Sequence, residues 1–82
     1  MYINNDAKYI RIPKSSNSIS SRLFIYIEGV LEKVFFITPG NEKGYTYYPL
    51  YKKGNKPIII EVSDEGLLDE LAIIVWWRKY AF

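Results

Sequence analysis

Short runs of alternating residues, each closed by glycine or proline, recur along the 82-residue chain at intervals of eight to twelve residues. An alternation with a period of two is typical of β-strands, and the glycines and prolines between the runs are typical of turns. About six such strands predict a small antiparallel β-sandwich or barrel. We therefore expect a single all-β domain over residues 1–82.

Five of the expected strands have clear limits. They cover residues 9–13, 22–28, 33–38, 45–51 and 58–62. The second and third of these are expected to pair as a hairpin through a tight connection at 29–32. Proline lacks the N–H that a central strand donates, so Pro13 predicts an edge strand or a strand end, and Pro49 predicts an edge or bulged strand.

The C-terminal region has two interpretations. Ser63 or Asp64 could cap a helix, whereas the β-branched and aromatic run that starts at Ile73 favours a strand. The favoured interpretation is a loop or a single helical turn at 64–69, followed by a long strand over residues 70–80. The alternative is a helix over residues 64–79, which would make the fold α+β.

Catalytic and metal-binding chemistry has little support in the composition. The chain contains no Cys and no His, so it has no disulfide, no thiolate ligand and no His-containing triad. The acidic residues between Glu61 and Glu70 do not follow the spacing of a calcium loop, and the serines between Ser15 and Ser21 have no neighbouring base. We expect no enzyme activity, no cofactor, no metal site and no small-molecule substrate.

The net charge, the N-terminal segment and the longest apolar run indicate where the protein is located. The formal net charge of +2 neither requires nor excludes an anionic partner. The N-terminal segment has no basic region followed by an apolar run, so it does not resemble a signal peptide. The longest uncharged apolar run, residues 71–77, is far shorter than the roughly 20 residues that span a bilayer. These features predict a virion or cytoplasmic protein without a membrane span.

The aromatic content is the strongest indication of function. Aromatic residues make up 17% of the chain, and most expected strands carry large apolar side chains on both faces. A domain of this size cannot bury all of them, and exposed apolar patches usually mark interfaces. In the strand expected at 45–51, three tyrosines share one face. The predicted interface residues are Tyr45, Tyr47, Tyr51, Trp77 and Arg78.

Two tryptophans lie near the end of the chain, at Trp76 and Trp77. On a strand they would point to opposite faces, so one ring would fill the core and the other would face outward. An outward tryptophan beside Arg78 has the composition of an interface hot spot.

The tyrosines and lysines of residues 43–56 indicate an alternative function, the binding of single-stranded nucleic acid. Aromatic rings can stack on bases while lysines attract phosphates. The lysines that would serve are Lys43, Lys52, Lys53 and Lys56. This alternative, a small barrel of the OB or SH3-like kind, requires these lysines to share a face with exposed tyrosine rings. An edge strand protected by lysines would have the same composition.

The favoured functional hypothesis is a structural or interaction module that acts through protein–protein contacts, as a homo-oligomer or within a larger assembly. Abundant Ile, Tyr, Lys and Asn with only three Ala indicate AT-rich codons. In size, strand spacing and composition the chain is similar to the small β-sandwich accessory proteins of bacteriophage particles. That similarity implies a head-decoration, fibre or tail-connector protein. The remaining alternative is a small protein inhibitor of a host enzyme.

Overall fold

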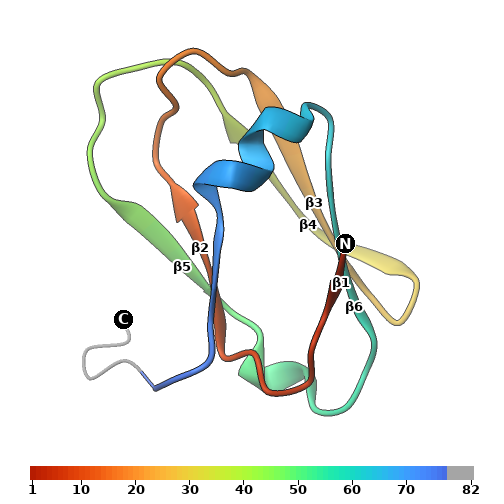
Figure 1. Ribbon diagram of the computed structural model, residues 1–82. Helices are drawn as coiled ribbons and strands as arrows, with labels where there is room; N and C mark the ends of the chain where they lie inside the picture. The colour runs from red at the N-terminus through yellow and green to blue at the C-terminus, as the bar shows by residue number, and fades with distance from the viewer. Residues whose placement is uncertain (78–82) are drawn as a thin grey trace.

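Two antiparallel sheets face each other across one core in the computed structural model, which describes residues 1–77 (Figure 1). The four-stranded sheet has the order β1 (Tyr2–Ile3), β6 (Ile58–Val62), β3 (Ser21–Ile27) and β4 (Val30–Ile37). The three-stranded sheet has the order β5 (Tyr45–Pro49), β2 (Tyr9–Pro13) and β7 (Ala72–Ile74). The prediction of a small all-β sandwich is confirmed.

Branched aliphatic side chains from both sheets form the core. Leu23, Ile25 and Ile27 alternate along β3 and point inward, because the side chains of a strand point to its two faces in turn. Ile10 and Ile12 face them from β2. The other buried members of the core are Ala7, Ile37, Leu50, Ile58, Ile60 and Leu67. The core therefore occupies only the inner face of each sheet, and the outer faces must be accounted for separately.

The hairpin of β3 and β4 is confirmed, but its connection is shorter than predicted. The turn consists of Glu28 and Gly29, which both have positive φ (53° and 80°), and β4 begins directly at Val30. Two positive φ values match the right-handed twist of a two-residue hairpin. The register shifts between Ile25 and Tyr26, which leaves Glu32 as an extra residue on β4. The predicted connection at 29–32 is therefore wrong.

Both prolines lie at the ends of strands. Pro49 ends β5, an edge strand, as predicted. Pro13 ends β2, which is the central strand of its sheet, so only the strand-end prediction holds for Pro13. The two-residue strand β1 was not predicted, because two residues are too few to show a period.

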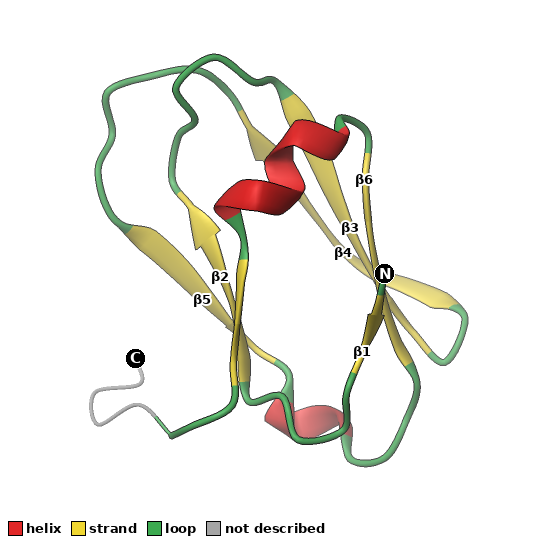
Figure 2. Ribbon diagram, viewed as in Figure 1, coloured by secondary structure: helices red, strands yellow, loops and turns green. Residues whose placement is uncertain are grey.

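A 3₁₀ helix, η2 (Glu65–Glu70), crosses one end of the sandwich between β6 and β7 (Figure 2). Asp64 caps it by accepting a hydrogen bond from the Gly66 N–H at 2.9 Å, and Leu67 fills the space between the sheets. The helical turn expected at 64–69 is found there, but η2 has six residues and is therefore longer than the single turn predicted. A second 3₁₀ helix, η1 (Tyr51–Lys53), follows β5.

The long final strand and the alternative C-terminal helix are both wrong. The strand β7 covers only Ala72–Ile74, and it pairs with β2 from Arg11 to Tyr9. The ladder stops where β2 begins, because the chain before Lys8 turns away through a hydrogen bond from the Ala7 N–H to the Asn4 carbonyl. Residues 75–77 consequently continue without a pairing partner, and residues 78–80 of the predicted strand lie outside the described part of the chain.

Candidate functional site

The outer face of the three-stranded sheet gathers the predicted aromatic residues. Tyr45 and Tyr47 lie opposite Pro13 and Arg11, whereas the core residues of β2 lie opposite Thr46 and Tyr48. Tyr45 and Tyr47 therefore point away from the core. Tyr51 lies over the same face, since its ring contacts Tyr9, which alternates with Ile10 on β2. The three tyrosines share a face as predicted, but the predicted strand over 45–51 is too long, because β5 ends at Pro49 and Tyr51 belongs to η1.

Three aromatic rings, those of Tyr9, Tyr51 and Trp77, pack edge to face at one end of this surface. Tyr9 is only 1% exposed although it lies outside the core cluster, because Tyr51 and Trp77 cover it. The ring centres of Tyr51 and Trp77 are 4.8 Å apart, and those of Tyr9 and Tyr51 are 5.6 Å apart, both in edge-to-face geometry. Such pairs stabilise by about 0.5–1.5 kcal/mol beyond their buried area.

Cations lie over the rings along the same face. The Lys8 Nζ atom is 4.8 Å from the centre of the Trp77 ring, and the Arg11 guanidinium is 4.2 Å from the centre of the Tyr45 ring. Sequence reasoning missed Tyr9, Lys8 and Arg11. The alternation of residues 9–13 places Tyr9 and Arg11 on one face, but only the pairing of β2 with β5 shows that this face meets the tyrosines.

The tryptophan pair does not have the predicted arrangement. Trp76 and Trp77 lie beyond the end of β7, and each is 60% exposed, so neither ring fills the core. Arg78, the cation predicted to accompany Trp77, lies outside the described residues.

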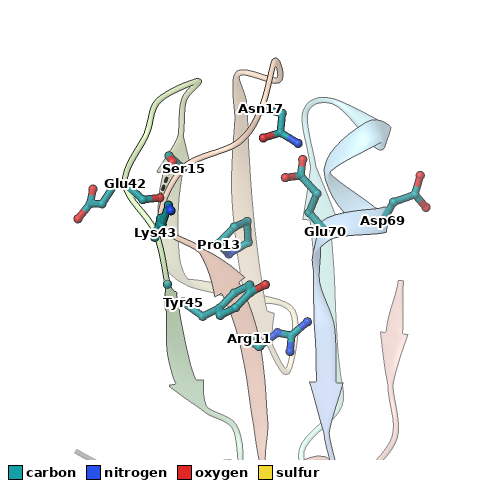
Figure 3. A pocket seen from close by; sticks show the side chains of 10 residues that line it. Arg11, Pro13, Ser15, Asn17, Glu42, Lys43, Tyr45, Asp69 and Glu70 are labelled. Atoms are coloured by element: carbon teal, nitrogen blue, oxygen red, sulfur yellow. Dashed lines mark hydrogen bonds between the residues drawn. The ribbon is translucent and has the colours of Figure 1, made fainter.

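The four candidate lysines do not form one cluster. Lys43 precedes β5 and lines a cavity (Figure 3), whereas Lys52 and Lys53 follow the other end of that strand. Lys53 forms an ion pair with Glu32 at 2.6 Å, and Lys56 lies 4.0 Å from the carboxylate of Glu28. These contacts direct Lys53 and Lys56 toward β4 and its turn. Only Lys52 lies over an exposed tyrosine ring, that of Tyr51, at 5.9 Å.

A polar contact joins the two sheets on the side where β4 and β5 approach. The Glu32 carboxylate accepts hydrogen bonds from the Tyr48 hydroxyl and from Lys53, and the hydrogen bond with Lys53 is the main reason that the pKa of Glu32 is lowered. Burial of the phenol, with a further contribution from Glu32, raises the pKa of Tyr48 to about 12. Glu32, Tyr48 and Lys53 are therefore engaged with one another, which indicates a structural role for these three side chains.

The outer face of the four-stranded sheet is a second candidate surface, which sequence reasoning did not define. Outward positions alternate with the core residues of β3, so Phe24 lies beside Val34, and Tyr26 lies between Leu31 and Ile59. Phe36 and Tyr2 extend this face to its two edges, and they are 69% and 81% exposed. Its two charged residues are Arg22 and Glu61. We call this surface the apolar face; its residues are Tyr2, Arg22, Phe24, Tyr26, Leu31, Val34, Phe36, Ile59 and Glu61.

Several acidic and serine residues singled out in the sequence have structural partners. Asp64 caps η2, and the Glu70 carboxylate accepts a hydrogen bond at 2.8 Å from the hydroxyl of Ser16, which is buried. Within residues 1–77, no three acidic side chains are placed to share a metal ion. In the same part of the chain, no helix is long and apolar enough to cross a membrane.

Comparisons with models of protein families, with curated proteins and with solved structures give no match to this chain. Its function therefore has to be argued from the two surfaces described above.

Proposed function

We propose that this protein is a non-enzymatic structural module that associates with a second copy of itself through the apolar face. The observation that carries this proposal is an uncovered sheet face with four aromatic side chains, of which Phe36 is 69% exposed. Monomeric proteins rarely expose large contiguous apolar patches, and such patches usually mark interfaces. Face-to-face packing of two sheets would bury these rings as a sandwich core buries its own.

Charge favours a second copy as the occupant of this face. The apolar face carries one cation, Arg22, and one anion, Glu61, which lie on neighbouring strands near the same end of the sheet. In a two-fold arrangement, each surface meets an identical copy of itself. Arg22 of one copy can then face Glu61 of the other, so no charge needs to be buried without a partner.

The bacteriophage setting predicted from composition is consistent with this proposal, because a decoration, fibre or connector protein acts through repeated contacts between copies. The nucleic-acid alternative is less well supported by the arrangement of the cations. Lys53 and Lys56 lie beside acids, and Lys43 is separated from the Tyr51 and Trp77 rings by the length of β5.

The experiment that tests self-association is the solution mass by light scattering across a concentration series. For the wild-type chain we expect the mass to rise from 9.6 kDa toward about twice that value. Single-stranded DNA should not change this rise. A wild-type mass that stays at that of the monomer at every concentration would contradict the proposal, and DNA-dependent, salt-sensitive binding would favour the nucleic-acid alternative.

A pair of variants on one strand provides the control. Phe36→Lys places a charge on the apolar face and should keep the protein monomeric. Val30→Lys changes a residue of the same strand that is equally exposed (67%) but lies opposite Ile27, a core residue, and so belongs to the other face. It should associate like the wild type. Equal loss of association in both variants would show that added charge alone, rather than the apolar face, controls the mass.

A further inference from the structure

A polar cavity of about 430 Å³ lies over the outer face of the three-stranded sheet, on the opposite side of the molecule from the apolar face. The end of β2 and the start of β5 form its floor, and the loop after β2, the loop before β5 and the end of η2 surround it. Its volume is within the range of small-molecule and side-chain binding sites. Figure 3 shows the Arg11 guanidinium and the Tyr45 ring side by side on this floor, with Asn17 and Glu70 above them.

Arg11 has few interactions that would explain it as a structural residue. Its guanidinium lies 4.2 Å from the centre of the Tyr45 ring, but its Nε atom is buried and has no hydrogen-bond partner within residues 1–77. The ion pairs of this part of the chain involve other cations, Lys53 and Lys56. A buried donor without a hydrogen-bond partner destabilises the folded state, so the interactions within the fold do not explain this arginine.

The contact with Tyr45 leaves the guanidinium N–H groups available to an anion in the cavity. The Arg11 guanidinium lies 4.2 Å from the centre of the Tyr45 ring, and such cation–π contacts hold an arginine side chain in place. The two Nη groups of an arginine match the two oxygens of a carboxylate in a bidentate pair. The Tyr45 hydroxyl also points into the cavity, where it can donate to the same ligand (Figure 3).

The other charges around the cavity discriminate between anions. The lining contains two cations, Arg11 and Lys43, and three carboxylates, those of Glu42, Asp69 and Glu70. The carboxylates repel any anion, and a ligand with a single negative charge meets the least repulsion. A phosphate carries about −1.5 to −2 at neutral pH and would meet stronger repulsion. One oxygen of the Glu70 carboxylate accepts a hydrogen bond from the Ser16 hydroxyl, and the Glu42 and Asp69 side chains point away from the centre (Figure 3).

We propose that this cavity binds a carboxylate through the Arg11 guanidinium, with the Tyr45 ring as its support. The carboxylate belongs either to an acidic side chain of a protein segment or to a chain end or small acid. The site does not depend on self-association, because it lies on the other sheet. Failure of one proposal therefore leaves the other standing.

The test is nuclear magnetic resonance of the arginine side chains. The sequence contains three arginines, so three Nε–Hε signals report on three positions. The titrants are N-acetylaspartate amide, N-acetylglycine, N-acetylasparagine amide as the neutral control, and inorganic phosphate, all at constant ionic strength. We expect the Arg11 signal to shift saturably with the two carboxylates and to stay in place with the neutral amide. Stronger binding of the aspartate derivative would identify a side-chain carboxylate, and stronger binding of N-acetylglycine would identify a chain end.

Arg22 is the matched control, because its guanidinium also lies over an aromatic ring, that of Phe36, at 5.3 Å, but outside the cavity. Arg11→Lys keeps the charge and removes the planar fork, so it should weaken carboxylate binding by about tenfold or more. Lys33→Arg, at a cation that lies over the Phe35 ring outside both the cavity and the apolar face, should leave binding unchanged. If Arg11→Lys does not fold, Tyr45→Leu replaces it as the weakened variant.

Three results would overturn the proposal. The first is an Arg11 signal that does not respond to carboxylates. The second is an equal response of Arg11 and Arg22, which would indicate general screening of surface charge. The third is a response to phosphate that is stronger than the response to the carboxylates.

Discussion

The Tyr48 hydroxyl donates a 2.9 Å hydrogen bond to the Glu32 carboxylate and so links β5 of one sheet to β4 of the other. No backbone ladder joins these two strands, which belong to different sheets. The Phe35 ring packs against Tyr48 beside this bond, with ring centres 5.6 Å apart. Between β4 and β5 themselves the two sheets are joined by these side-chain contacts, and stability should depend on them.

We expect Tyr48→Phe to lower the free energy of unfolding by about 0.5–1.5 kcal/mol, because it keeps the ring and removes one hydrogen bond. The pKa of Tyr48 is raised from 10.0 to about 12, so the native state keeps its proton longer than the unfolded state. The wild-type advantage over Tyr48→Phe should be full below pH 10 and should disappear as pH rises toward about 12. Denaturant unfolding of both proteins between pH 10 and about 12 measures this difference in the free energy of unfolding. A difference that does not change with pH would contradict the prediction.

The contribution of Glu32 to stability depends on pH in the opposite direction, because it is lost at acid pH. Its pKa is lowered from 4.5, chiefly by the hydrogen bond with Lys53, so its contribution is present above pH 4.5 and is lost as pH falls through the lowered value. At neutral pH, Glu32→Gln should cost less than about 1 kcal/mol, as expected for a partly exposed ion pair. The difference between wild type and variant should shrink in acid. A difference that grows in acid would exclude this ion pair as its source.

Ser16→Ala should destabilise the fold by about 1–3 kcal/mol, because the buried hydroxyl has two partners. It donates to Glu70 at 2.8 Å and accepts from the Ile19 N–H at 3.2 Å, and so ties the loop after β2 to η2. Ser18→Ala is the control, since Ser18 is exposed in the same loop. Thermal unfolding of the two variants should separate clearly, and equal midpoints would contradict the assigned role.

Glu28→Asn should stabilise the hairpin by about 0.5–1 kcal/mol. Glu28 has a φ of 53°, a left-handed conformation that asparagine adopts more readily than glutamate. The ion pair lost with Lys56 is exposed and 4.0 Å long, so its loss should cost little. The unfolding midpoint of the variant in denaturant measures the balance, and a lower midpoint would show that the ion pair outweighs the backbone strain.

The alternating pattern of the sequence was sufficient to predict the strands that are long and flanked by turns. Residues 9–13 and 58–62 have the limits expected from it, because glycine or proline and a period of two agree there. The end of the chain could not be predicted in this way. The β-branched run after Leu71 favours a strand throughout, but β7 ends at Ile74 because its antiparallel partner β2 begins at Tyr9, a fact of pairing rather than of local preference.

The candidate surfaces were predictable only in part, for the same reason. The excess of aromatic residues required some to be exposed, and the face shared by Tyr45 and Tyr47 followed from their spacing on β5. Tyr51 lies beyond the end of this strand and reaches the same face through its contact with Tyr9. Which strands lie side by side was not readable from one sequence. The structure was therefore needed to show that Arg11 contacts the Tyr45 ring and that Phe24 pairs with Val34.

The central claim is that two copies meet through the apolar face. Isotope-filtered nuclear magnetic resonance on a mixture of labelled and unlabelled chains detects contacts between copies and no contacts within one copy. We expect such contacts from the rings of Phe24, Tyr26 and Phe36. Contacts from Tyr51 and Trp77 instead, or no intermolecular contacts in a sample whose mass shows association, would contradict the claim.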